Sequence, residues 1–209
     1  MKSGIRFFDI LLSLVLLISL APFMLLIYLG VKLTSGGQGI FSQIRVGKDN
    51  KDFTLYKFRT MQVNTESIRS LTVGTNDSRI TRFGSFLRKY KLDELPQLWN
   101  VLKGEMSMVG PRPELRKYVE CYTEEQKEIL SVRPGITDFA SLVFKDENEI
   151  LGGVQDPENY YIKEVIPIKI NLNRYYLSHR NLRIYFLLIF KTVFSVSVKQ
   201  KSNSGFKTL

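Results

Sequence analysis

The sequence contains very few of the residues from which disulfides, zinc sites and nucleophile–histidine pairs are built. It has one cysteine, Cys121, and one histidine, His179. A single cysteine excludes an internal disulfide and fits a reducing compartment, where we expect it to be a small buried residue. One cysteine and one histidine leave no evident zinc cluster or Ser–His or Cys–His catalytic set, so we expect His179 at the surface or at a helix cap.

Acidic residues are outnumbered, with 20 Asp and Glu against 30 Lys and Arg, and the formal net charge is +10. An excess of this size indicates a polyanionic partner: nucleic acid, anionic lipid or a phosphorylated substrate. No Walker glycine loop is present, which argues against a P-loop kinase. The aromatic residues form no pattern of a base-stacking module, which disfavours nucleic acid. The chain has 209 residues, 44% of them hydrophobic, and this predicts about one folded domain.

Charge is missing altogether from Ile10 to Val31, a run of 22 residues. As a helix this run would be about 33 Å long, which matches the hydrocarbon core of a bilayer. A cleaved signal peptide is disfavoured because Pro22 would directly follow the potential cleavage site at Ser19–Ala21. Two alternatives stay open: a straight transmembrane span, or a re-entrant helix that bends inside the bilayer and returns.

Two features favour the re-entrant helix. Pro22 lies near the middle of the run, where it removes a backbone donor and predicts a kink. Cations flank both ends of the run, and the positive-inside tendency then places both ends on the cytoplasmic side. These cations are Lys2, Arg6, Lys32, Arg45, Lys48 and Lys51.

Two strand patterns follow, Ile40–Val46 and Phe53–Thr60, and the polar segment between them predicts a β-hairpin. Side chains alternate between the two faces of a strand, so Lys57 and Arg59 project from the same face. This pair of cations is either a phosphate clamp or a solvated strand face. The segment Met61–Asn76 is polar and weakly patterned, which predicts a loop or a frayed helix.

An amphipathic helix is predicted from Arg79 to about Tyr90, capped by Asp77 or Ser78. Its basic face includes Arg88, and it can lie on anionic headgroups or form one wall of an anion pocket.

The C-terminal half shows weaker patterns of caps, turns and apolar runs. They predict a capping box at Thr123–Gln126, a turn at Ser131–Asp138, an irregular stretch at Phe139–Gly153, a helix opened by Asp156 and bent by Pro167, and an interfacial helix at Ile184–Val198.

Adjacent carboxylates, Asp93 and Glu94, stand between the basic helix and a short apolar helix pattern that leads to Gly110–Pro113. With Asp93 as the N-cap, Pro96 falls in the first helical turn, where its missing amide costs little. The simplest interpretation is structural, with Asp93 as a cap and Glu94 as an acid that matches the helix dipole. The functional hypothesis is that Asp93 is a nucleophile and Glu94 its partner.

Phosphoryl transfer is the chemistry that suits this pair. A carboxylate can attack phosphorus and form an acyl phosphate. Both partners are anionic, so cations, a helix N-terminus or Mg²⁺ must neutralise the phosphate oxygens. Mg²⁺ prefers one or two carboxylates plus phosphate oxygens, and Asp93 and Glu94 can supply the carboxylates. The cations predicted to hold phosphate are Lys57, Arg59, Arg88 and Arg112.

Seven ordered segments carry motifs: Arg6–Ile10, Lys57–Met61, Asp77–Thr81, Leu87–Arg88, Leu92–Ser107, Val109–Pro113 and Arg133–Thr137. Together they resemble the bacterial sugar transferases, which are monotopic phosphoglycosyl transferases, also called polyprenyl-phosphate sugar-1-phosphate transferases. The resemblance runs from about residue 3 to 195 and is to the short form, without the extra N-terminal membrane helices of larger members. Family members often have Ser-Pro at the helix break, whereas this chain has Ala21 before Pro22, so the hydrogen bond of that serine is missing.

The resemblance implies that a UDP-sugar gives its sugar-1-phosphate to undecaprenyl phosphate and releases UMP. This is the first membrane step of a bacterial surface glycoconjugate such as an exopolysaccharide. It also implies a covalent phosphosugar on Asp93, activation of the polyprenyl phosphate by Glu94, and Mg²⁺ beside both carboxylates. Arg88 and Arg112 are then the first candidates for phosphate ligands, followed by Lys57 and Arg59, while Arg133 either contacts the nucleotide or belongs to a structural turn.

The expected fold is α+β and mostly helical. A re-entrant membrane helix covers 1–33, a catalytic domain on the cytoplasmic face of the inner membrane covers 34–198, and a basic tail covers 199–209. In that domain a small β-hairpin and amphipathic interfacial helices surround the Asp–Glu site. The expected partners are a UDP-sugar, undecaprenyl phosphate and membrane lipids. The alternative function is a non-catalytic basic protein that binds the membrane surface. The sequence does not identify the sugar, and we expect Asp138–Asp156 to govern that choice.

Overall fold

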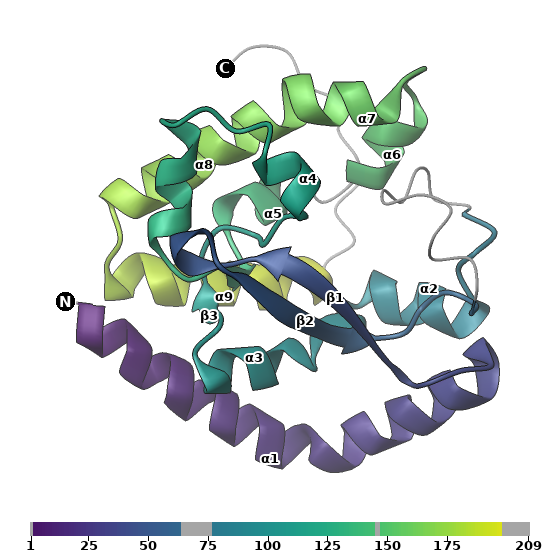
Figure 1. Ribbon diagram of the computed structural model, residues 1–209. Coiled ribbons are helices and arrows are strands. Elements are labelled where there is room, and N and C mark those ends of the chain that lie inside the picture. The colour runs from purple at the N-terminus through teal and green to yellow at the C-terminus, as the bar shows by residue number, and fades with distance from the viewer. Residues whose placement is uncertain (1, 64–76, 145–146, 198–209) are drawn as a thin grey trace.

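The computed structural model describes residues 2–63, 77–144 and 147–197 (Figure 1). It is mostly helical, with one long apolar helix at the N-terminus, as the sequence predicts, and it contains two small two-stranded sheets. Most of the predicted loop at Met61–Asn76 and the whole basic tail at 199–209 lie outside the described residues.

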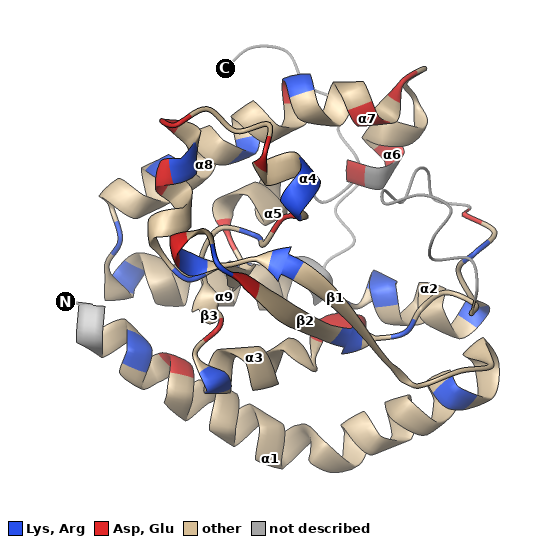
Figure 2. Cartoon of the chain, in the orientation of Figure 1, with Lys and Arg blue, Asp and Glu red and all other residues tan. Residues whose placement is uncertain are grey.

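Helix α1 spans Lys2–Ser35 and has Pro22 in its interior. Figure 1 shows that α1 bends in its middle and wraps under the rest of the chain, with both arms turned toward it. A proline in a helix interior removes one backbone hydrogen bond and is a common cause of such a bend. Among the described residues, one helix is long and apolar enough to cross a membrane, Gly4–Ser35, and its most apolar stretch of 18 residues has a mean hydropathy of 2.9. Its charges lie only near its two ends (Figure 2).

The predicted β-hairpin is confirmed. Strand β1 spans Ile40–Val46, strand β2 spans Asp52–Phe58, and they pair antiparallel, with the 3₁₀ turn η1 at Lys48–Asn50 between them. Helix α3, which spans Gln97–Lys103, holds the hairpin through Asn100. The Nδ2 of Asn100 donates to Thr54 O at 2.7 Å, and its Oδ1 accepts from Tyr56 N at 3.2 Å. This amide ties β2 to the segment that follows the carboxylate pair.

Helix α2 begins later than predicted, at Arg82, and ends at Lys89. Thr81 is its N-cap, because its Oγ1 accepts from Gly84 N at 2.9 Å. The predicted cap at Asp77 or Ser78 is therefore wrong. Asp77 instead forms a local turn in which its carboxylate accepts from the backbone and guanidinium of Arg79, a competing use of such side chains.

A second, parallel sheet was not predicted. Strand β3 at Ser107–Val109 pairs with strand β4 at Gly135–Thr137, so the predicted turn at Ser131–Asp138 contains a strand. The two backbone segments approach so closely that a Cβ at Gly110 would lie 2.4 Å from Arg133 O. Strands of three residues separated by 25 residues or more leave no local periodicity from which they could be predicted.

The remaining helices cover the hairpin and the parallel sheet. The predicted capping box is confirmed, since Thr123 N donates to Gln126 Oε1 at 3.0 Å and Gln126 N donates to Thr123 Oγ1 at 3.2 Å. The stretch predicted to be irregular contains α5 and α6 instead. The helices that follow β3 are α4 Arg116–Val119, η3 Gln126–Ser131, α5 Phe139–Val143, α6 Glu147–Gly152, α7 Pro157–Tyr160, the π-helical η4 Tyr161–Val165, α8 Ile166–Ser178 and α9 Leu182–Ser197.

Caps and bends in this half agree with the sequence in part. Asp156 caps α7 by accepting from Asn159 N at 3.2 Å, and Pro167 lies in the first turn of α8, after a π-helical segment. His179 is exposed at the C-cap of α8, as predicted. The prediction for Cys121 is wrong, because this thiol is exposed.

Three hydrophobic clusters position the site. One joins the first half of α1 to α3, β3, α8 and α9; a second joins α4, η3 and α8; a third joins the second half of α1 to β2 and α2. Asp9 of α1 lies within the first cluster and is buried. Its Oδ1 accepts hydrogen bonds from Ser107 Oγ, Met108 N and Tyr185 OH, each at 2.9 Å. This carboxylate therefore ties α1 to β3 and α9.

Candidate active site

The adjacent carboxylates lie in a short 3₁₀ turn, η2, at Leu92–Glu94. Helix α3 begins only at Gln97 and ends at Lys103. The interpretation of Asp93 as an N-cap is therefore wrong, since its side chain makes no capping bond. The turn starts at Lys91, whose backbone is left-handed with φ 56°. Strained residues of this kind often mark functional sites.

Asp93 is buried, with 8% of its surface exposed, and Oδ1 has no hydrogen-bond partner among the described residues. Burial raises the pKa of Asp93, and the negative charge of Glu94 raises it further. The positive charges of Lys57, Arg88 and Lys91 act in the opposite direction. A buried, unbonded carboxylate oxygen beside three cations is poorly satisfied without a further partner.

We call Asp93 and Glu94 the dyad. The side chains of Lys57 on β2 and Arg88 on α2 reach these two carboxylates. Burial lowers the pKa of Lys57 to about 8, helped by the charges of Arg45 and Arg88 and opposed by Asp93. Burial also lowers the pKa of the Arg88 guanidinium, while Asp93 acts against that shift. Arg88 Nε donates to Thr60 Oγ1 at 2.8 Å, which fixes α2 against the end of the hairpin. Both predicted cations therefore lie at the carboxylates.

Glu94 is paired with Arg112, whose Nη2 lies 2.5 Å from Glu94 Oε1. Burial alone would raise the pKa of Glu94, but the charge of Arg112 and its hydrogen bond hold that pKa at about 2. The same pairing raises the pKa of Arg112. The backbone of Arg112 is also fixed, because its N donates to Asp138 Oδ2 at 3.2 Å. Glu94 and Arg112 therefore form a preorganised ion pair.

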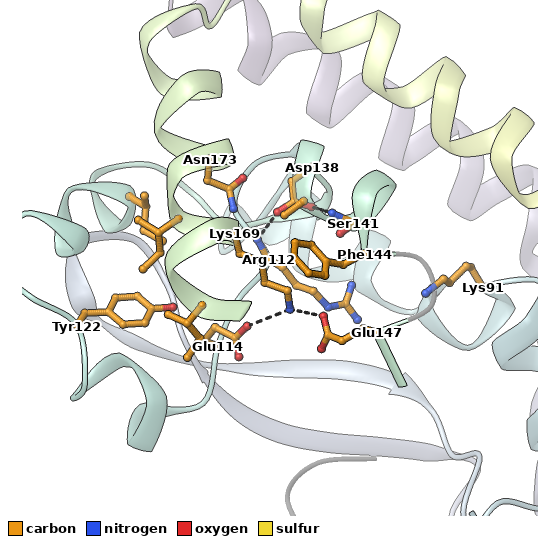
Figure 3. A pocket seen from close by; sticks show the side chains of 14 residues that line it. Lys91, Arg112, Glu114, Tyr122, Asp138, Ser141, Phe144, Glu147, Lys169 and Asn173 are labelled. Atoms are coloured by element: carbon orange, nitrogen blue, oxygen red, sulfur yellow. Dashed lines mark hydrogen bonds and ion pairs between the residues drawn. The ribbon is translucent and has the colours of Figure 1, made fainter. Parts of the chain in front are cut away.

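A pocket of about 160 Å³ lies between Arg112, Lys91 and helix α8 (Figure 3). Arg112 and Lys91 border it and also act on the carboxylates. Its opposite wall is α8, where the buried Lys169 forms an ion pair with Glu147 at 2.5 Å and lies 4.0 Å from Glu114. Asn173 Oδ1 is buried in the same wall without a hydrogen-bond partner among the described residues. The pocket is polar and offers both charges and unbonded groups to a ligand.

Three site cations were missed from the sequence: Lys91, Arg45 and Lys169. Lys91 stands two residues before Asp93, and this proximity was the available signal. Arg45 is half-buried near Lys57, and its Nη1 lies 3.8 Å from Glu114 Oε2. No local pattern relates Arg45 or Lys169 to the dyad, since the fold alone brings them there.

Two further predicted cations, Arg59 and Arg133, also contact other parts of the chain, and the phosphate role of Arg59 stays a prediction. Arg59 shares the Phe41 ring with Lys57 as a cation–π partner, and its Nε donates to Gln38 O at 2.9 Å. Arg133 Nε donates to Gly104 O at 2.6 Å, at the C-terminal end of α3. The dyad precedes the other end of that helix, and its seven residues span about 10 Å. The nucleotide role of Arg133 stays a prediction.

Magnesium fits this site together with a substrate phosphate. Within the described ranges, no group of three or more His, Cys, Asp or Glu side chains could hold a metal ion by itself. The unbonded Oδ1 of Asp93 is an available oxygen, and Mg²⁺ in proteins often takes one or two carboxylates plus phosphate oxygens. Asp93 and Glu94 are thus the residues that would hold the ion, and Mg²⁺ at this site stays a prediction.

The family model for bacterial sugar transferases matches residues 2–199. The UDP-N-acetylgalactosamine-undecaprenyl-phosphate N-acetylgalactosaminephosphotransferase of Aeromonas hydrophila is 38% identical over 191 residues, which cover 90% of this chain and 42% of that protein. The UDP-glucose:undecaprenyl-phosphate glucose-1-phosphate transferase of Klebsiella pneumoniae is 37% identical, with coverages of 89% and 39%.

A relative of more similar length is the uncharacterized sugar transferase EpsL of Bacillus subtilis, 43% identical over 137 residues, which cover 66% of this chain and 67% of that protein. The chain thus spans less than half the length of the Aeromonas hydrophila and Klebsiella pneumoniae relatives.

Proposed function

This chain belongs to the bacterial sugar transferase family, and we propose that it transfers a sugar-1-phosphate from a UDP-sugar to undecaprenyl phosphate and releases UMP. The names of its relatives support this reaction, since they join a UDP-sugar donor to an undecaprenyl-phosphate acceptor. Their names include both N-acetylgalactosamine and glucose, so they leave the sugar of this chain open.

The first step is proposed as an attack of Asp93 Oδ1 on the β-phosphorus of the UDP-sugar. A bond forms between Oδ1 and this phosphorus while the bond to the bridging oxygen breaks, and UMP leaves with that oxygen and its electron pair. The support is the buried Oδ1, which has no hydrogen-bond partner within the described ranges and is flanked by Lys57, Arg88 and Lys91. These cations offset the repulsion between two anions, which is the main barrier to attack by a carboxylate.

The second step returns the enzyme to its starting state. A phosphate oxygen of undecaprenyl phosphate attacks the phosphorus of the acyl phosphate, and the bond from phosphorus to Asp93 Oδ1 breaks. The Asp93 carboxylate is regenerated, and the product is undecaprenyl diphosphate that carries the sugar. Both steps displace an oxygen at the same phosphorus, so one set of cations serves both.

Glu94 is proposed to act mainly through Arg112 before the acceptor binds. With a pKa of about 2 it is a weak base in the free enzyme, but its ion pair fixes the Arg112 guanidinium at the pocket. A bound phosphate that competes for Arg112 would free Glu94 to act on the acceptor. Mg²⁺ held by Asp93 and Glu94 would neutralise charge on the phosphate oxygens.

The lipid acceptor places the reaction at a membrane, and the fold offers a surface for it. Large apolar side chains are exposed along α1 and α9, for example Ile18 at 69% and Phe190 at 59%. We propose that α1 enters the inner membrane as a re-entrant helix and that α9 lies at the interface, with the dyad on the cytoplasmic side. The product would serve the assembly of a surface glycoconjugate.

The buried, unpaired Asp93 beside a cluster of cations carries the proposal. Asp93→Asn should lower steady-state UMP release by at least about 1,000-fold, because the nucleophile is lost. Asp49→Asn, in the exposed turn of the hairpin, is the matched control and should leave the rate unchanged. The assay uses detergent-solubilised protein with undecaprenyl phosphate, Mg²⁺ and a panel of UDP-sugars.

Normal turnover by Asp93→Asn would remove Asp93 as the nucleophile. A different result, a wild type that releases no UMP and whose liposome binding falls steeply with salt, would favour the alternative of a non-catalytic protein that binds anionic membrane surfaces.

A further inference from the structure

Lys91 has an unusual backbone for its residue type. Its φ of 56° and ψ of 20° are left-handed, and among the described non-glycine residues this sign of φ is shared only with Asp49 and Asn50. Those two are Asp and Asn in an exposed hairpin turn, residue types that tolerate this conformation. A lysine gains no such local hydrogen bond, so its conformation is imposed by the turn that carries the dyad.

The Lys91 side chain is also unusual in its surroundings. It is exposed, it borders the 160 Å³ pocket, and Figure 3 shows it directed toward that pocket from the side opposite α8. Within residues 2–63, 77–144 and 147–197, its ammonium has no hydrogen-bond or ion-pair partner. By contrast, the Arg112 guanidinium is held by Glu94, and the Lys169 ammonium is held by Glu147.

Position completes the case. Lys91 and Arg112 both line the pocket, and the positive charges of both lower the pKa of Glu94 in the dyad. A ligand group held between these two cations would therefore lie between the pocket and Asp93. In the proposed reaction that group is the transferred phosphate. Its negative charge must be neutralised before the Asp93 carboxylate can approach the phosphorus.

We propose that Lys91 binds the β-phosphate of the nucleotide-sugar donor directly and so forms the second arm of a clamp with Arg112. This rests on the proposed function. The left-handed backbone at residue 91 serves to present the ammonium to the pocket while residues 93 and 94 carry the carboxylates. Lys91 is thus a substrate-contacting residue and supplies a positive charge that is not already bound to any acid among the described residues.

Three variants separate charge from backbone. Lys91→Asn removes the charge but keeps a residue that adopts left-handed φ readily. Lys91→Arg keeps the charge. Lys89→Gln removes a charge two residues away, where the Lys89 ammonium lies 5.1 Å from the centre of the Tyr90 ring.

Binding is measured by calorimetry on solubilised protein that also carries Asp93→Asn, so that no reaction occurs, with UDP and UMP as probes. UDP contains the β-phosphate and UMP lacks it. Lys91→Asn should weaken UDP binding by about 10- to 100-fold, the value of one charge-assisted hydrogen bond, and should leave UMP binding unchanged. Lys91→Arg should stay within about 3-fold of its parent for both probes.

Unchanged UDP affinity in Lys91→Asn, or an equal loss for UDP and UMP, would overturn the role of Lys91. An equal loss in Lys89→Gln would reduce it to a general effect of surface charge and would also overturn it. Absence of binding of either nucleotide to the parent would count against the proposed function itself, and the Lys91 inference would fail with it.

Discussion

At the scale of single residues, the dyad holds two carboxylates in opposite electrostatic states. Burial and its neighbour raise the pKa of Asp93, whereas Arg112 holds the pKa of Glu94 at about 2. Environments that shift the pKa values of two neighbouring acids in opposite directions are typical of sites in which the two acids have different roles. Here the less stabilised carboxylate is the one with an unbonded oxygen, which suits a nucleophile.

The raised pKa of Asp93 predicts a change in stability. An acid whose pKa is raised on folding stabilises the protein below its unfolded pKa of 3.8, and this contribution is lost as pH rises through the folded pKa. Asp93→Asn stays neutral, so the variant should melt at a higher temperature than the wild type at pH 7.5, and the difference should vanish near pH 4. For a chain of this size, 1 kcal/mol corresponds to about 2–4 °C.

Thermal unfolding in detergent without nucleotide measures this difference at both pH values. A variant that is less stable than the wild type at pH 7.5 would show that the cations satisfy the charge of Asp93 fully. It would then remove the electrostatic reason to regard this carboxylate as activated.

Sequence reasoning worked well for residues whose chemistry is local. Asp93, Glu94, Arg88 and Arg112 were predicted from a short motif region and adjacent basic segments, and the fold brings their side chains together. Lys169 and Arg45 could not be predicted because they enter from α8 and β1 through tertiary packing. The cap assigned to Asp93 was wrong because the apolar pattern of α3 could not reveal the intervening 3₁₀ turn.

At the scale of elements, the membrane helix and the active-site strand are tied by one buried carboxylate. Asp9 of α1 accepts from Ser107 Oγ and Met108 N of β3, and from Tyr185 OH of α9. Strand β3 leads directly into the turn that carries Arg112. The position of α1 is thus coupled by hydrogen bonds to the arginine that pairs with Glu94.

Asp9→Leu is predicted to destabilise the protein strongly. It keeps the branched shape and the number of side-chain heavy atoms but leaves donors of β3 and α9 buried without an acceptor, at about 1–3 kcal/mol for each group. Asp9→Asn keeps one acceptor oxygen and should cost less. Melting temperature and UMP release are measured for both variants in the same detergent.

The expected order of stability and activity is wild type, Asp9→Asn, Asp9→Leu. If Asp9→Leu were as stable as the wild type, these donors would have other acceptors and α1 would not be coupled to β3 through Asp9.

Elements with a local signal were predicted, and those with none were missed. The β-hairpin and the Thr123–Gln126 capping box follow from alternation and from side-chain spacing, and both are confirmed. The parallel pair β3–β4 was missed, because its three-residue strands exist only through the close approach of Gly110 and Gly135. Helix α2 began three residues later than predicted, at Arg82, since Asp77 and Arg79 bond to each other.

At the scale of the whole molecule, the apolar surfaces of α1 and α9 indicate how the protein meets a bilayer. The two helices contact through Phe8 and Phe186, whose ring centroids lie 5.0 Å apart. The bend of α1 turns both of its arms toward the rest of the chain (Figure 1). A straight span would leave one end of α1 on the far side of the membrane, so the bend supports re-entry.

This topology predicts the labelling of two engineered cysteines. In a Cys121→Ser background, Lys2→Cys and Thr34→Cys place a thiol at each end of α1. Both should resist a membrane-impermeant maleimide in intact spheroplasts and react after lysis. Reaction of either one in intact spheroplasts would establish a straight span and contradict re-entry.

The central claim is that Asp93 carries the sugar phosphate covalently. The most direct measurement is intact-mass spectrometry of the enzyme after a rapid quench with the UDP-sugar that it turns over, Mg²⁺ and no lipid acceptor. The account predicts release of about one UMP per enzyme, a mass increase of one sugar phosphate on the peptide that contains Asp93, and loss of this adduct when undecaprenyl phosphate is added. Turnover with acceptor but no adduct and no UMP release without it would contradict the account, because the sugar phosphate would then pass directly between the two substrates.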